Sequence, residues 1–98
     1  MKKNKLVVCA DGFSMSVQAS ETTYCNPRDN MGPYIEAEIG FPSAKEELIM
    51  RWADDPGQPT ETVYGYVPRQ VILNVIAKHG GMVEGELPNG MPNLWGSP

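Results

Sequence analysis

The sequence predicts an α+β fold: a two-layer domain in which an antiparallel sheet of about four strands carries two helices packed on one face. Two observations support this class. The chain offers strand, strand, strand, helix, strand and helix in that order, and three successive strands with short connections favour antiparallel pairing. Each strand and each helix also has one apolar face, and a sheet covered by two helices buries all of these faces at once.

The first two strands are predicted to form a hairpin. Residues 6–10 are a short apolar run rich in β-branched side chains, and Asp11-Gly12 is the dipeptide that a two-residue type I′ turn favours. Residues 13–20 then alternate strictly between apolar and polar side chains. This period of two is typical of a strand with one buried face and one solvated face.

Residues 21–33 are predicted to be a loop, because they contain several turn-forming pairs with Pro, Gly and Asn. Loops of this length are often functional or disordered. A third strand is expected over residues 34–41. One face of this strand consists of Ile35, Ala37, Ile39 and Phe41.

The first helix is expected to begin at Ser43. Ser43 and Glu46 have the spacing of a capping box, in which each side chain accepts a hydrogen bond from the backbone N–H of the other residue. Leu48, Ile49 and Trp52 would form the apolar face. Residues 54–59 contain two prolines and would end the helix.

Residues 62–67 predict a fourth strand, in which Gly65 marks either a bulge or a close approach by another element. A second helix follows, and Gly80-Gly81 supplies its left-handed stop. The buried face of this helix consists of Val71, Ile72, Val75 and Ile76. Beyond it we expect one short strand at most, so residues 1–84 are assigned to a single domain and residues 85–98 to an extended or flexible C-terminal tail.

The composition fits one small globular domain and weighs against several functional classes. The 98 residues are 41% apolar, which argues against intrinsic disorder. Twelve acidic and eight basic residues give a net charge of −4, which disfavours binding to nucleic acid through its phosphates. No apolar run approaches the ~20 residues that span a bilayer, so we expect neither a membrane segment nor a targeting segment.

No strong catalytic or metal-binding motif is present, so we expect a protein that is not an enzyme and uses no cofactor or metal. Cys9 and Cys25 are expected to be reduced thiols. Cys25 is either a reactive thiol near Arg28 or a small buried hydrophobic residue, and we favour the second reading. His79 is either a general base or the C-cap of the second helix, and we favour the cap.

Binding residues are expected in the long loop and on the fourth strand. Tyr24 and Arg28 lie in the loop, and Tyr64 and Tyr66 alternate onto one face of the strand. Arg28 can present a planar fork of donors to a carboxylate or phosphate, and tyrosines supply apolar contact with a polar tip. These four residues are the predicted binding surface. The alternative is that the loop simply covers this face of the sheet.

Four segments together resemble a family of small uncharacterised proteins of tailed bacteriophages and prophages. They are residues 9–20, 24–28, 61–68 and 76–81. The resemblance implies no activity and no functional residues. It implies a product that acts in the cytoplasm of an infected bacterium, where small phage accessory proteins often work by binding.

We therefore expect a phage-encoded binding protein that modulates or inhibits a host factor. Its partner would be a host or phage protein, with a homodimer as a further option. The alternative is an oligomeric protein that binds or sequesters a small anionic or aromatic molecule.

Overall fold

The chain has the α+β fold that the sequence predicts, built on one open antiparallel sheet. The computed structural model describes residues 3–96. The strands lie in the order β4-β3-β2-β1-β5, one strand more than the four expected. In chain order the elements are β1 (Val7–Cys9), β2 (Ser14–Gln18), β3 (Glu36–Gly40), the 3-10 helix η1 (Glu47–Trp52), β4 (Val63–Pro68), α1 (Arg69–Lys78) and β5 (Met82–Glu84).

The predicted hairpin is formed by β1 and β2, but its turn is one residue longer than expected. The Cys9 N–H donates to the Phe13 carbonyl at 2.8 Å, which leaves residues 10–12 in the turn. The Gly12 N–H donates to the Cys9 carbonyl, and Gly12 has a φ of 94°. The two-residue type I′ turn is therefore wrong. A three-residue loop with glycine in the left-handed region is the next common way to close a hairpin.

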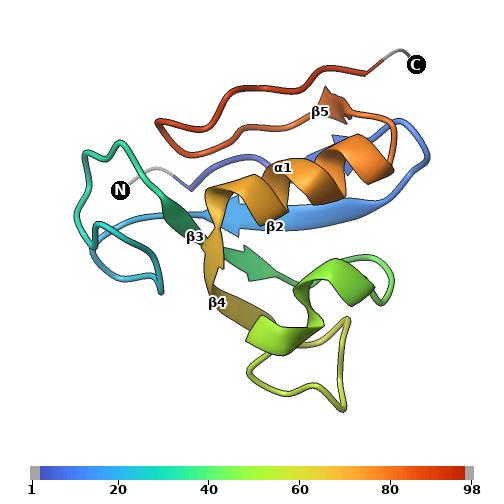
Figure 1. The fold of residues 1–98 in the computed structure, drawn as a ribbon, viewed down its shortest axis with the longest axis horizontal. Coiled ribbons are helices and arrows are strands. Elements are labelled where there is room, and N and C mark those ends of the chain that lie inside the picture. The colour runs from blue at the N-terminus through green and yellow to red at the C-terminus, as the bar shows by residue number, and fades with distance from the viewer. Residues whose placement is uncertain (1–2, 97–98) are drawn as a thin grey trace.

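The hydrophobic core lies on the face of the sheet that α1 and η1 cover (Figure 1). The predicted alternation is confirmed in β2 and in the middle of β3. Ile35 and Phe41 are exposed, contrary to the prediction, because β3 is shorter than expected and Phe41 leaves it with a φ of 47°. The fully buried side chains of the sheet and helices include Val7, Met15, Val17, Ile39, Ile49, Tyr64, Val67, Ile72, Val75 and Ile76.

The first predicted helix is a single 3-10 segment, and the capping box at Ser43 is wrong. The Ser43 N–H donates to the Ser14 carbonyl at 2.8 Å, and the Ser14 N–H donates to the Ser43 hydroxyl at 2.9 Å. Ser43 is thus held by β2 and cannot begin a helix. Glu46 is the N-cap instead, and its carboxylate accepts from the Leu48 N–H. Of the predicted apolar face, only Ile49 is fully buried.

The end of α1 follows the prediction. His79 is the C-cap residue, and the two glycines after it have φ values of 89° and 88°. The Gly80 N–H donates to the Ala77 carbonyl and the Gly81 N–H donates to the Ile76 carbonyl. This is the Schellman arrangement, which satisfies the last carbonyls of the helix. Neither helix in residues 3–96 is long and apolar enough to cross a membrane.

The segment after β5 is extended and runs beside β5 (Figure 1). The Met82 N–H donates to the Leu94 carbonyl at 2.6 Å, and the Gly96 N–H donates to the Met82 carbonyl at 2.8 Å. Met91, in the same segment, is buried in the core cluster. Residues 94–96 therefore cover the outer edge of β5 at Met82. The last two residues of the predicted tail lie outside the described residues.

The core assignment predicts the cost of truncating one residue of α1. Ile72→Ala should lower the free energy of unfolding by about 2–5 kcal/mol, because it removes a fully buried side chain and leaves a cavity. Leu48→Ala, at an exposed position of η1, should cost less than about 1 kcal/mol. Urea denaturation followed by circular dichroism measures both. Equal effects of the two substitutions would contradict this core.

Candidate functional site

The long loop meets β4, and this contact brings together three of the four predicted binding residues. The Tyr66 N–H donates to the Tyr24 carbonyl at 2.9 Å, and the two ring centroids are 5.8 Å apart. The Arg28 guanidinium lies over the Tyr24 ring, with its Cζ 5.6 Å from the centroid. Tyr24 is 47% exposed and Tyr66 is 44% exposed. The loop thus supplies half of a surface that the strand completes.

A bulge in β4 turns Tyr66 outward. Ala37 pairs with Val67 and Ile39 pairs with Tyr64, so two steps along β3 match three steps along β4. The extra residue breaks the alternation of side chains between the two faces. Tyr66 takes up the irregularity with a φ of 55°, a left-handed conformation that is rare for a bulky residue.

The predicted exposure of Tyr64 is wrong. Its side chain is fully buried, and its hydroxyl donates to the Pro59 carbonyl at 2.6 Å. The bulge explains the error, because Tyr64 and Val67 both face the core while Tyr66 between them faces solvent. Burial raises the pKa of the Tyr64 hydroxyl. Tyr64 supports the surface from below and cannot contact a partner directly.

Gly65 allows the loop to approach the strand this closely. A Cβ atom at position 65 would lie 3.0 Å from the Tyr24 Cβ, which is closer than an ordinary van der Waals contact. Both structural readings of this glycine, a bulge and a close approach by another element, are confirmed.

A hollow of about 350 Å³ opens beside the two tyrosines. It is lined by Tyr24, Trp52, Ala53, Asp54, Val63, Gly65 and Tyr66. The Arg51 guanidinium lies over the Trp52 ring, with its Cζ 5.2 Å from the centroid. Trp52 and Arg51 come from η1, so three separate segments build this side of the molecule. We refer to Tyr24, Arg28, Trp52 and Tyr66 as the aromatic surface.

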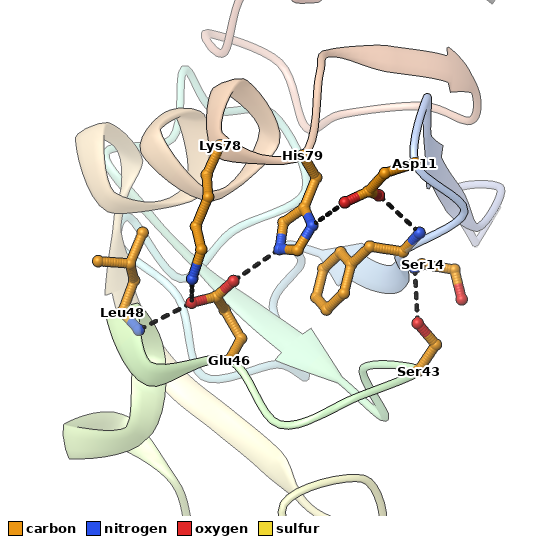
Figure 2. A network of polar contacts seen from close by, with 8 residues as sticks. Asp11, Ser14, Ser43, Glu46, Leu48, Lys78 and His79 are labelled. Carbon is orange, nitrogen blue, oxygen red and sulfur yellow. Dashed lines mark hydrogen bonds and ion pairs between the residues drawn. The ribbon is translucent and has the colours of Figure 1, made fainter.

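A cluster of charged side chains, separate from the aromatic surface, lies at the C-terminal end of α1 (Figure 2). The His79 Nδ1 is 2.6 Å from an Asp11 carboxylate oxygen, and its Nε2 is 2.6 Å from a Glu46 carboxylate oxygen. Lys78 donates to the other Glu46 oxygen at 2.8 Å. The Phe13 ring stacks on the imidazole with centroids 4.1 Å apart. This ion network joins the β1–β2 turn, the end of α1 and the segment before η1.

The ion network favours the charged form of His79. Burial alone would lower the pKa of His79, but the hydrogen bonds to Asp11 and Glu46 outweigh it and raise the pKa. Burial alone would raise the pKa of Glu46, and the bonds from the Leu48 N–H, Lys78 and His79 lower it overall. A carboxylate can only accept, so both ring nitrogens donate. His79 therefore has no free lone pair with which to act as a general base.

The two cysteines are buried and free, and no disulfide joins them. The Cys25 thiol donates to the Ser20 carbonyl at 3.1 Å, which fits the reading of Cys25 as a small core residue. Burial, with a smaller contribution from the Asp11 charge, raises the pKa of Cys9 to about 11. A thiol in this state is a poor nucleophile. In residues 3–96 no cluster of His, Cys, Asp and Glu side chains is arranged to hold a metal ion.

Sequence reasoning missed Trp52, Arg51 and Asp54 as neighbours of the predicted site. Trp52 was assigned to the apolar face of a helix, and a 3-10 segment places it half-buried beside β4 instead. Ala53 bridges to Tyr64, and the Asp54 N–H donates to the Val63 carbonyl at 2.9 Å. No local sequence pattern predicts the pairing of Ala53 and Asp54 with β4, because it depends on the path of the chain after η1.

The chain matches no protein-family model, and no solved structure matches it.

The ion network predicts that stability falls on both sides of weakly acidic pH. The raised pKa of His79 stabilises the fold fully below its ordinary value of ~6.5, and this contribution is lost as pH rises through the folded-state pKa. The lowered pKa values of Asp11 and Glu46 stabilise the fold above about 4, and this contribution is lost at lower pH. Urea midpoints from pH 3 to pH 8 measure the profile.

His79→Gln is the matched variant for this profile, because glutamine can donate a hydrogen bond but does not titrate in this range. We expect wild-type stability to decrease from pH 6 to pH 8, and the decrease to be much smaller in His79→Gln. Equal slopes in the two proteins would show that His79 does not carry the charge assigned to it.

Proposed function

We propose that this chain is a phage-encoded, non-enzymatic binding protein that acts on a host factor through the aromatic surface. The observation that carries the proposal is the conformation of Tyr66. A non-glycine residue in the left-handed region costs roughly 1–2 kcal/mol, and such strain is concentrated at functional sites. Here the strain does not bury the ring, since Tyr66 remains 44% exposed. It places an aromatic side chain at the surface, next to Tyr24.

The residue types of this surface support a protein partner. Tyrosine, tryptophan and arginine are the residues most enriched among those that dominate binding energy in protein interfaces. Tyr24, Arg28, Trp52 and Tyr66 gather these types on one side of a chain that has only three arginines and two tryptophans. The chemistry of the other clusters supports binding over catalysis, because His79 has both nitrogens engaged and both thiols are buried.

A second candidate function is the binding or sequestration of a small anionic or aromatic molecule. The hollow beside Tyr24 and Tyr66 favours it, because about 350 Å³ lies near the lower limit for small-molecule sites. Such a ligand would stack against the rings and leave its charged group at the rim.

The proposal predicts that replacing Tyr66 weakens binding strongly without harming the fold. Asparagine tolerates the left-handed region better than tyrosine, so Tyr66→Asn should change the free energy of unfolding by no more than about 1 kcal/mol. Losing a central aromatic contact worth 2 kcal/mol weakens binding about 30-fold. Affinity capture from bacterial lysate, with wild-type and variant protein immobilised, measures the loss.

Phe41→Asn is the matched control. Phe41 is also an exposed aromatic residue with positive φ, but it lies outside the aromatic surface. A host protein retained by wild type and Phe41→Asn, and lost with Tyr66→Asn, supports the proposal. Mass spectrometry of small molecules released on denaturation distinguishes the second candidate. A set of captured proteins and small molecules that is identical for all three chains would refute both functions.

A further inference from the structure

Arg28, in the aromatic surface, and Arg51, beside it, have unused hydrogen-bonding capacity. Each guanidinium carries five N–H donors in a fixed plane. Within residues 3–96, the side chains of Arg28 and Arg51 form no hydrogen bond or ion pair, and each guanidinium lies over an aromatic ring instead. The third arginine differs, since Arg69 donates to the Gly90 carbonyl at 3.2 Å. The two unpaired guanidiniums therefore lie over Tyr24 and Trp52, two rings that line the same hollow.

The absence of acidic partners is notable in a chain with twelve acidic and eight basic residues. Asp29 follows Arg28 directly, but its carboxylate accepts from the Met31 and Gly32 N–H groups. Glu38 lies close to the same loop, and its carboxylate accepts from the Tyr24 N–H at 3.1 Å. The carboxylates of Asp29 and Glu38 thus bond to backbone donors, and neither forms an ion pair with Arg28.

Stacking also prepares both guanidiniums for a partner. Contact with the ring already restricts each side chain, so less side-chain entropy is lost when the guanidinium binds a partner. A planar carboxylate or a phosphate matches this fork with two parallel hydrogen bonds. Asp54 is the one carboxylate that lines the hollow, whereas two guanidiniums lie over rings that line it.

We infer that the partner protein presents an acidic segment to this surface, with a carboxylate or phosphate on Arg28 and Arg51 beside an aromatic or apolar side chain in the hollow. This inference rests on the proposed function and specifies the chemistry of the partner. Arg28 and Arg51 are the selectivity residues, and the rings supply the apolar contact.

Small probes test the inference without knowledge of the partner. Phenyl phosphate combines an aromatic ring with an anion, and benzylamine has the same ring with a positive charge. Titration of ¹⁵N-labelled protein should shift the amide signals of residues 24, 52–54 and 66 with phenyl phosphate, and benzylamine should bind at least about fivefold more weakly. The double variant Arg28→Gln/Arg51→Gln should lose at least about fivefold in affinity for phenyl phosphate, whereas Arg69→Gln should bind as wild type does.

Three results would overturn the inference: tighter binding of benzylamine, equal binding by the double variant, or no shift with phenyl phosphate at millimolar concentration. A host protein whose capture depends on Tyr66 would leave the proposed function intact in each case. Failure of that capture together with specific, arginine-dependent binding of phenyl phosphate would instead favour a small anionic ligand at the same site, and would refute the acidic protein segment.

Discussion

The arrangement of this fold depends on the hydrogen bonds and ion pairs of one buried carboxylate, that of Glu46. Glu46 is only 1% exposed, and a charge in that position is strongly destabilising unless it is paired. Its partners come from the backbone of η1 and from the end of α1, and His79 extends the chain of contacts to Asp11 in the β1–β2 turn. Three segments that are distant in sequence are therefore fixed relative to one another by one set of charges. The same contacts engage both ring nitrogens of His79.

The second constraint is that both edges of the sheet are covered by the chain itself. Exposed edges invite pairing with other strands. At β5 the cover is the extended segment up to residue 96, and at β4 it is the bridge from Ala53 together with the contact from Tyr24. Main-chain pairing with a partner is therefore blocked along much of both edges. The proposed recognition of a partner would therefore rest on side chains, and the aromatic surface lies where the loop and η1 cover β4.

The fold class, the alternation of β2 and the two-glycine end of α1 could be predicted from sequence because each depends on local periodicity or on the special φ of glycine. The juxtaposition of Tyr24, Arg28 and Tyr66 was predicted as a surface, but only the structure places the loop on the strand. The errors have a common cause. Ser43 was assigned to a helix because its partner Ser14, 29 residues away, is not visible locally. Tyr64 was placed outside because a bulge shifts the alternation by one residue, and strand pattern alone does not locate a bulge.

The distribution of charge differs between the ion network, which fixes the fold, and the aromatic surface, which is the proposed binding surface. At the C-terminal end of α1, acidic and basic side chains neutralise one another and are partly buried, which stabilises one arrangement of the segments. Beside β4, Arg28 and Arg51 are left on aromatic rings while nearby carboxylates bond to backbone N–H groups. Substitutions that alter the aromatic surface therefore need not disturb the ion network. A strained tyrosine can persist at position 66 because the contacts that stabilise the fold lie elsewhere.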